Sequence, residues 1–365
     1  MKFLTHIARL LVAATFIFSG FVKLVDPLGS AYKFEEYFGA DVLNIEFLIP
    51  YALPFSIFLI LAEIMLGVKL LVGFKPKFTV WSLLVMIVIF LFLTWYSAYY
   101  DKVTDCGCFG DAITLTPWET FYKNIVLVVL IIFLLFNTND IKPIFGKSLA
   151  KWISFTSLLV FLFITYYVLV HLPIIDFRAY AVGKNIPDGM IFPEGAKQDV
   201  YKDTWIYNVE GEDKEYNTED KPWDIEGATF VDRKTKLIEK GYEPPIHDFT
   251  MEKEGIDFTE LLMQKDKLML IVMYNLAKAD KESFPKVKEI TTEALQNGYD
   301  VYAFSASNQA EFDEIKKEFD FDFDLLFCDE TTLKTIVRAN PGFVTLNRGT
   351  ITGKWNANDA DKVKL

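Results

Sequence analysis

The sequence predicts a multi-domain membrane protein, with an all-α bundle of transmembrane helices first and a soluble α/β domain last. Three observations carry this prediction. The chain of 365 residues is 52% hydrophobic, and its long apolar runs lie before about residue 173. The net charge is −12, and most of the acidic residues lie in the second half. From about residue 244, short apolar runs alternate with segments of helical periodicity, which is typical of an α/β sandwich.

Five apolar runs are long enough to cross a bilayer, since roughly 20 residues are needed to span its hydrocarbon core. They lie near residues 5–25, 48–73, 79–100, 121–138 and 152–173. The first run follows basic residues, as a signal peptide does, but its small residues Ala13 and Ala14 lie inside the run rather than after it. We therefore expect this segment to remain as a membrane helix.

Basic residues are divided unevenly among the short connections, and this division predicts the orientation. They gather at the start of the first run and after the second and fourth runs: Lys2, Arg9, Lys75, Lys77, Lys142, Lys147 and Lys151. The 26–47 connection is acidic, and the 101–120 connection holds one lysine. The N-terminus is thus expected in the cytoplasm and the chain after about residue 174 outside. In a bacterium this predicts a multi-pass inner (cell) membrane protein with a periplasmic C-terminal domain.

The organisation expected from these patterns has four parts. Residues 1–140 form a four-helix membrane domain, and residues 141–173 form a cytoplasmic loop and a fifth transmembrane helix. Residues 174–243 form a strand-rich periplasmic adaptor, and residues 244–365 form the α/β domain. The acidic balance argues against a nucleic-acid partner, because phosphate needs a basic face. Membrane lipids and a periplasmic protein are the expected partners.

Ionisable side chains inside the apolar runs are costly and are therefore structural or functional by default. Glu63 falls near the middle of the second run, where Arg9 is its best partner by depth and Lys69 the second. Lys23 lies near the outer end of the first run and Asn124 near the outer end of the fourth. Helix association through Glu63 is one interpretation. A transporter or lipid-handling bundle built around it is weaker, because the runs lack obvious helix breaks or inverted repeats.

The stretch DCGCFGD, residues 105–111, holds two of the three cysteines, Cys106 and Cys108. Cysteines two apart with a glycine between them can close a small, strained and easily reduced disulfide ring. A structural turn whose thiols are buried and idle, or a static disulfide, is an alternative. A metal site is less favoured, since zinc takes four ligands and no histidine is near in sequence. We expect no metal, and we expect the ammonium group of Lys23 to favour the reactive thiolate.

Three segments resemble the DoxX/MauE family of small membrane bundles. They are ARLLVAATFIFSGFVKLVDP, LAEIMLGVKLLVGF and DCGCFGDAITLTPWETFYKNIVLVVL, and together they cover roughly the first 140 residues. The resemblance implies a four-helix bundle with a role in disulfide formation or in quinone-linked sulfur oxidation. A quinone is the electron acceptor that it implies, although no sequence feature of its own predicts one. The fifth run and the outer domain depart from the family pattern.

Residues 244–365 resemble the thioredoxin-like fold of the TlpA and peroxiredoxin type. The segment PIHDFTM is similar to the opening of that fold. The apolar runs LMLIVMYN and DVYAFSAS are of buried-strand length, and helical segments follow each of them. The segment NPGFVTL lies where the family has a cis-proline, so a cis bond is expected before Pro341.

One departure from the thioredoxin pattern bears on the chemistry. The first long strand runs into NLAKADKESF, residues 275–284, which has no cysteine where a redox member carries Cys-x-x-Cys. Cys328 ends a later strand and is predicted to be a buried small hydrophobe. Lys334 and Arg338 lie four apart on one helix face and are predicted to be solvated. This domain is therefore not expected to exchange thiols by itself.

Two functions of different classes follow. The first is a membrane-anchored periplasmic thiol-disulfide protein that supports disulfide formation or maturation of partner proteins through Cys106 and Cys108. As an enzyme it would be a quinone-linked thiol-disulfide oxidoreductase. The alternative is a non-enzymatic membrane-anchored assembly or binding factor, because a fold without its reactive residues serves as an interaction scaffold and fold alone does not imply function.

Overall fold

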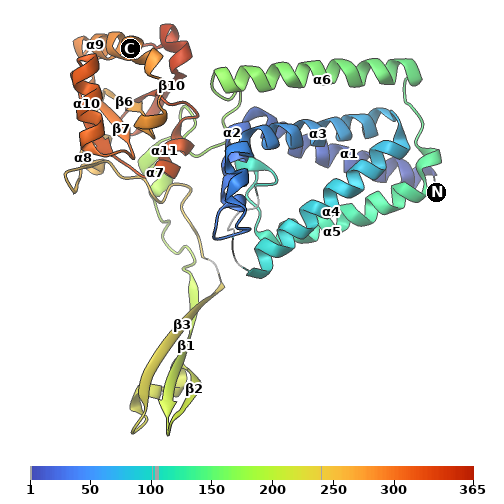
Figure 1. The fold of residues 1–365 in the computed structure, drawn as a ribbon, viewed down its shortest axis with the longest axis horizontal. Coiled ribbons are helices and arrows are strands. Elements are labelled where there is room, and N and C mark those ends of the chain that lie inside the picture. Colours follow the sequence, from blue (N-terminus) through green and yellow to red (C-terminus); the bar gives the residue numbers. More distant parts are fainter. Residues whose placement is uncertain (1, 101, 103–106, 240) are drawn as a thin grey trace. The chain divides into compact units, whose positions relative to one another are not determined.

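The computed structural model describes residues 2–100, 102, 107–239 and 241–365 (Figure 1). The chain forms two compact units. We call Met1–Lys184 together with Thr250–Leu365 the main unit, and Asn185–Phe249 the inserted unit.

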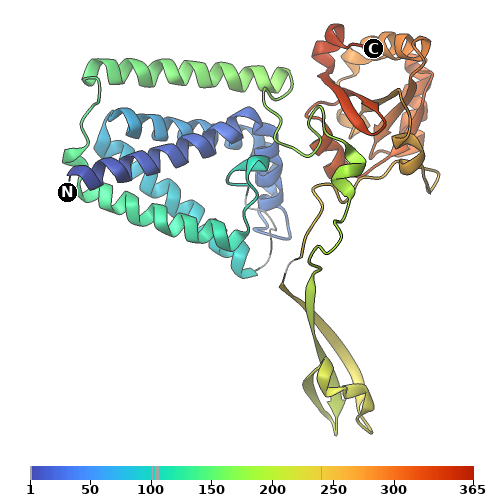
Figure 2. The ribbon, with the colours of Figure 1, turned by 180° about the vertical axis from the view of Figure 1, so that it is seen from behind.

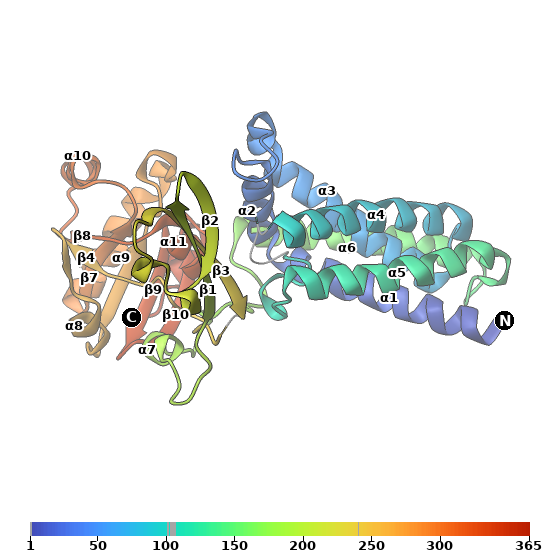
Figure 3. The same ribbon diagram turned by 90° about the horizontal axis from the view of Figure 1, so that it is seen from below.

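The main unit begins with a bundle of long helices. Its α-helices are α1 (Lys2–Val25), α2 (Pro27–Phe38), α3 (Ala52–Val72), α4 (Pro76–Tyr100), α5 (Pro117–Phe136) and α6 (Lys147–Val170). Within the described residues, five helical segments are long and apolar enough to cross a membrane: Lys2–Val25, Glu46–Val72, Pro76–Tyr100, Pro117–Phe136 and Lys147–Val170. Figures 1 and 3 show α4 and α5 running side by side along the bundle. The predicted membrane bundle is confirmed.

Helix α2 was not expected, because the sequence predicts an acidic loop over residues 26–47. The side chain of Asp26 caps this helix by accepting a hydrogen bond from the backbone N–H of Gly29 at 3.0 Å. Pro27 occupies the first turn, where its missing N–H has no cost. At the other end of the helix, the side chains of Tyr37 and Phe38 are buried. Figure 2 shows α2 lying across the end of the bundle remote from the N-terminus.

Two glycines let α1 and α3 approach closely. A Cβ atom on Gly20 of α1 would lie 2.7 Å from the Cβ of Ile64 on α3. A Cβ on Gly67 of α3 would lie 2.8 Å from the Cγ1 of Ile17 on α1. Each helix thus presents a small residue to a β-branched one on its neighbour, which is how membrane helices gain van der Waals contact. This contact fixes the relative rotation of the two helices.

A sheet of seven strands in the described residues forms the second part of the main unit, in the order β10-β9-β6-β7-β8-β4-β5. Its strands are β4 (Glu252–Lys253), β5 (Ile256–Asp257), β6 (Leu268–Val272), β7 (Asp300–Ser305), β8 (Asp324–Phe327), β9 (Gly342–Asn347) and β10 (Thr350–Asn356). Strands β6, β7 and β8 are parallel, whereas β9 pairs antiparallel with β6 and β10.

Helices connect these strands in the predicted alternation. They are α8 (Thr259–Met263), α9 (Phe284–Gln296), α10 (Gln309–Phe319) and α11 (Glu330–Ile336). Asn308 caps α10 by accepting a hydrogen bond from the N–H of Glu311. The Asn340–Pro341 bond, where a cis bond is expected, is cis. The C-terminal part therefore has the thioredoxin-like α/β architecture that the sequence predicts.

The inserted unit is built around a three-stranded antiparallel sheet, in the order β2-β1-β3. It contains α7 (Ile186–Met190), β1 (Val200–Val209), β2 (Glu212–Asn217) and β3 (Thr229–Glu239). Strands β1 and β2 form a hairpin, and Gly211 supplies its turn with a φ of 90°. Trp205 makes edge contacts with the rings of Trp223 and Phe230 at 5.6 and 6.3 Å. Contacts between aromatic side chains thus stabilise this sheet in place of an extensive hydrophobic core.

Candidate functional site

The cysteine loop lies between the end of α4 and the start of α5. A capping box starts α5: Thr116 accepts from the N–H of Glu119, whose carboxylate accepts from the N–H of Thr116. Cys108 is half-buried and carries a free thiol. Cys106 lies outside the described residues, so the geometry of the predicted pair rests on Cys108.

Contacts with two helices hold this loop in place. Ser19 of α1 donates a hydrogen bond from its hydroxyl to the backbone oxygen of Cys108 at 2.6 Å. The ring of Phe109 lies 5.5 Å from that of Phe18, and the ammonium group of Lys123 lies 4.2 Å from its centre. Gly107 has a φ of +61°, which a residue with a Cβ rarely adopts. The backbone of Cys108 and the ring of Phe109 are therefore held by α1 and α5.

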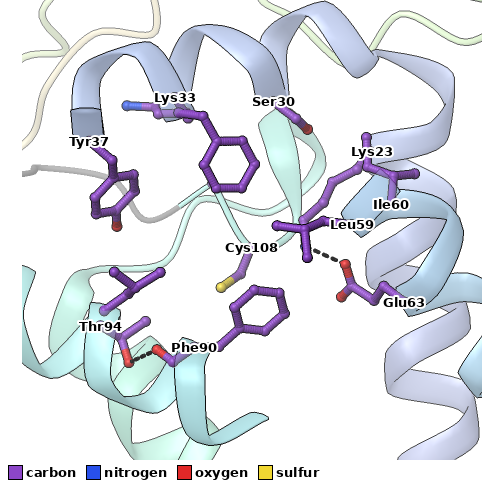
Figure 4. Close-up of a pocket in the computed structure, with 13 residues that line it drawn as sticks. Lys23, Ser30, Lys33, Tyr37, Leu59, Ile60, Glu63, Phe90, Thr94 and Cys108 are labelled. Atoms are coloured by element: carbon purple, nitrogen blue, oxygen red, sulfur yellow. Dashed lines mark hydrogen bonds and ion pairs between the residues drawn. The ribbon is translucent and has the colours of Figure 1, made fainter. Parts of the chain in front are cut away.

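The thiol faces a small pocket of about 70 Å³ at this end of the bundle. Figure 4 shows the sulfur atom of Cys108 directed into the pocket, with Phe90 and Thr94 of α4 beside it. Apolar side chains such as Leu59 make most of the wall, and the charged pair formed by Lys23 and Glu63 closes one side. The pocket thus combines a thiol, an ion pair and an apolar wall.

Lys23 and Glu63 form a buried ion pair between α1 and α3. Their charged atoms lie 2.8 Å apart, and only 12% and 5% of the two side chains are exposed. Lys23 also donates to the hydroxyl of Ser19 at 3.1 Å. The expectation that Arg9 is the partner of Glu63 is therefore wrong. The compensating carboxylate also reduces the field that Lys23 alone would exert on the thiol.

Arg9 instead closes the other end of α3. Its guanidinium donates to the backbone oxygens of Leu70, Leu71 and Lys142 at 2.8, 2.7 and 3.0 Å. The last carbonyl groups of a helix have no partner within the helix, and a cation near them is stabilising. Arg9 therefore has a structural role at the end of the bundle opposite Cys108.

Asn124 is another intramembrane polar residue that the sequence singles out. It is 2% exposed, and its amide donates to the hydroxyl of Thr94 at 3.3 Å. Thr94 in turn donates to the backbone oxygen of Phe90 at 2.9 Å. These two hydrogen bonds join α5 to the part of α4 that lines the pocket. Asn124 therefore stabilises the pocket wall.

The pocket does not fit the quinone that the family resemblance implies. Small-molecule sites usually enclose about 300–1,000 Å³, whereas this pocket encloses about 70 Å³. Filling it with a ring would require the surrounding helices to move apart. A second cavity of about 650 Å³ adjoins the loop at Gly107, Gly110 and Asp111, but charged side chains of both signs line it. Neither cavity offers the large apolar slot that a quinone needs.

The α/β part contributes no accessible thiol among the residues that the structure describes. The segment after β6, where a redox thioredoxin has its dithiol, contains no cysteine. Cys328 is fully buried behind β8, and its N–H donates to the backbone oxygen of Ser305 at 3.1 Å. Burial raises the pKa of the Cys328 thiol to about 11.

We expect Cys328 to stay unreactive in the folded chain. Its thiol is 0% exposed and protonated at neutral pH, whereas reaction requires an accessible thiolate. A thiol-reactive probe should label Cys328 only after denaturation, as measured by mass spectrometry of the labelled peptide. Labelling at the same rate in native and denatured protein would contradict this.

Arg338 is buried, and the prediction of a solvated face is wrong for this residue. Its guanidinium binds both carboxylate oxygens of Asp26, the cap of α2, at 2.9–3.1 Å. It also lies 5.3 Å from the ring of Tyr32. Burial alone would raise the pKa of the Asp26 carboxyl, but Arg338 outweighs burial and lowers it. Within the main unit, this pair links the segment after α11 to the start of α2, and Arg338 also lies 4.0 Å from the carboxylate of Asp111 in the cysteine loop.

Asp176, which follows α6, is held by two cations. Its carboxylate lies 2.6 Å from Nε of Arg178 and 2.6 Å from Nζ of Lys354 on β10. Burial by itself would raise the pKa of Asp176, but the two cations outweigh it and lower the pKa to about 2.

We expect Asp176 to make the main unit sensitive to acid. Because its folded pKa lies below the unfolded value, its contribution is complete above about pH 4 and is lost as the pH falls towards 2. That contribution is about 2 kcal/mol. Thermal unfolding of the full chain between pH 5 and 2 should show a smaller acid dependence in Asp176→Asn than in Asp322→Asn, an exposed control. Equal acid dependence in the two variants would contradict this assignment.

Together the fold and the site define a multi-pass membrane protein, with a thiol-bearing loop at one end of its bundle and a thioredoxin-like α/β part after it. Residues 1–137 match the family model of the methylamine utilisation protein MauE. This match covers the bundle through α5 and includes the cysteine loop.

A relative among curated proteins is Protein TlpB of Flavobacterium psychrophilum. The two are 26% identical over an alignment of 168 residues, and the alignment covers 42% of this chain and 44% of that protein. The chain thus spans less than half the length of this relative. No solved structure matches the chain.

Proposed function

We propose that this chain is a membrane-anchored thiol-disulfide protein in which Cys106 and Cys108 exchange with the thiols of a partner protein. The observation that carries the proposal is the position of Cys108. Ser19 holds the backbone of Cys108, and the free thiol faces a pocket that the Lys23–Glu63 pair also lines. The match of residues 1–137 to the MauE family and the likeness to TlpB support a membrane-associated role in protein maturation.

The exchange is balanced between the two proteins. A partner thiolate attacks the Cys106–Cys108 disulfide and forms a mixed disulfide, while the other cysteine leaves as a thiolate and takes up a proton. The partner's second thiolate then attacks the mixed disulfide and releases the second cysteine. The partner loses two electrons and two protons, and Cys106 and Cys108 gain them. Lys23 and Glu63, which line the same pocket, serve as the nearby proton donor and acceptor.

The proposed location follows from charge. The connections after α3 and α5 carry the lysines, so they belong in the cytoplasm of a bacterial cell with the N-terminus. The cysteine loop and the C-terminal part then lie together in the periplasm at the inner membrane. That compartment is oxidising, and its proteins are the partners that need disulfides.

A membrane-impermeant alkylating reagent tests the proposal in intact cells. The reagent is added with and without prior reduction. In wild-type molecules that hold the disulfide, it should modify Cys106 and Cys108 only after reduction. The Cys106→Ser/Cys108→Ser variant should show no such change. Thiols that never react under either condition, together with full function of the double variant, would refute the proposal.

A second function, a non-enzymatic assembly or binding factor, is favoured by a separate observation. The thioredoxin-like part has no cysteine in residues 275–284, and Cys328 is buried. Under this alternative the C-terminal part binds a partner and the bundle anchors it. Full function of Cys106→Ser/Cys108→Ser would decide for this alternative, because binding does not depend on the thiols.

A further inference from the structure

A second feature lies at the opposite end of the bundle, where α4 and α6 begin and α3 and α5 end. A cavity of about 660 Å³ opens there between the connections that follow α3 and α5. Four lysines line it, Lys75, Lys77, Lys142 and Lys147, whereas none of its lining residues is acidic. The cavity therefore presents a concentrated positive charge that the thiol chemistry does not use.

These lysines are not neutralised within the described part of the chain. No carboxylate there lies within 4.0 Å of any of the four ammonium groups, whereas Lys23, Lys33 and Lys354 of the same unit each have one. The contact made by Lys75 is with the ring of Phe74, at 5.8 Å. Asp140 is the nearest acid in sequence, but its side chain does not line the cavity. An anion is therefore the missing counter-charge.

Two helix N-termini reinforce this charge. Helix α4 begins at Pro76 and helix α6 at Lys147, and both residues line the cavity. No side chain caps α6, whose N-cap is Gly146 with a φ of +82°. The first N–H groups of a helix are donors without partners inside the helix, and they favour negative charge, phosphate above all.

The apolar neighbours place the cavity at the depth of lipid headgroups. Phe78 lines it and is 62% exposed. Trp81 on α4 and Trp152 on α6 are 56% and 60% exposed, each within about a turn and a half of its helix start. Exposed tryptophans near the ends of membrane helices mark the interface between headgroups and acyl chains. A lipid whose anionic headgroup binds here would have its acyl chain lying along α4 or α6.

We propose that this cavity binds the phosphate of an anionic membrane lipid. The four lysines and the start of α6 take the phosphate group, while Phe78 and the tryptophans contact the glycerol and the first methylene groups. Basic pockets between membrane helices bind anionic headgroups in this way. The site does not depend on the thiol function at the other end of the bundle.

Native mass spectrometry of the purified full chain tests the site. The protein is exposed to equal amounts of phosphatidylglycerol and phosphatidylcholine with the same acyl chains. We expect the wild type to retain phosphatidylglycerol at least about tenfold better, because each lysine near an anionic headgroup adds to the attraction. The variant Lys75→Gln/Lys77→Gln/Lys142→Gln/Lys147→Gln should lose this preference.

A matched variant controls for total charge. It replaces four exposed lysines of the inserted unit by glutamine, Lys202, Lys214, Lys221 and Lys236, and should retain the wild-type preference. Equal retention of the two lipids by the wild type, or the same loss in both quadruple variants, would overturn the proposal. So would displacement of the lipid by inorganic phosphate in excess, because that outcome indicates a soluble anion as the ligand. If the first variant does not fold, Lys75→Gln/Lys77→Gln and Lys142→Gln/Lys147→Gln must each lose part of the preference.

Discussion

Replacing Glu63 alone should strongly destabilise the bundle. In Glu63→Leu the ammonium group of Lys23 remains buried without its carboxylate, and removing one partner of a buried ion pair costs about 3–5 kcal/mol. The loss is measured as the drop in the thermal unfolding midpoint of the full chain in lipid nanodiscs. The variant should also change the shape of the pocket, because Lys23 and Glu63 both line it with Cys108.

Two further variants separate the buried charge from the shape of the side chain. Lys23→Met/Glu63→Leu removes both charges and should recover most of the lost stability, since an apolar pair of similar volume is often neutral or stabilising. Glu36→Leu breaks the exposed Lys33–Glu36 pair and should cost less than about 1 kcal/mol. A double variant no more stable than Glu63→Leu would show that the pair matters through packing and not through charge.

Removing either cysteine of the loop should end thiol exchange. With Cys106 or Cys108 alone, the loop cannot form the internal disulfide that a partner thiolate attacks. The remaining loop thiolate can attack only the disulfide of an already oxidised partner, and no second thiol of the chain resolves that mixed disulfide, because Cys328 is buried. We expect the rate of partner oxidation to fall to the background in Cys106→Ser and in Cys108→Ser. Mixed with a partner in its disulfide form, at least one of the two should accumulate a mixed disulfide, visible on a non-reducing gel.

Cys328→Ser is the matched control for this experiment, because it also removes one thiol. It should keep the wild-type exchange rate. A rate in Cys108→Ser equal to that of Cys328→Ser would show that the loop does not carry the reaction. Loss of exchange in Cys328→Ser would show that the buried thiol becomes accessible during the cycle.

The membrane bundle and the α/β part were both predictable, because each leaves a strong local pattern. The membrane runs are recognised by length and hydropathy alone, and β6 and β7 are continuous apolar runs of strand length. Helix α2 was missed because it is too short to span a bilayer and its acidic residues Glu35 and Glu36 made the connection look like an exposed loop. Its signal was present in Asp26 followed by Pro27, a cap and a first-turn proline.

The partner of Glu63 could not be obtained from depth along the sequence. Arg9 and Lys23 are 14 residues apart, so they lie roughly 21 Å apart along α1. Which of them meets Glu63 depends on how α3 slides and rotates against α1, and the contacts of Gly20 and Gly67 set this. The contact between Arg338 and Asp26 could not be predicted for the same reason. It depends on tertiary packing between residues 312 positions apart in the sequence.

The state of the cysteine loop across a series of glutathione buffers tests the central claim most directly. The full chain in lipid is equilibrated at each ratio of reduced to oxidised glutathione, quenched with an alkylating reagent and digested. Mass spectrometry then reads the peptide that contains Cys106 and Cys108. We predict that this peptide changes from two alkylated thiols to an internal disulfide as the buffer becomes oxidising, while Cys328 stays a thiol. A peptide that keeps one state across the whole series would contradict the account.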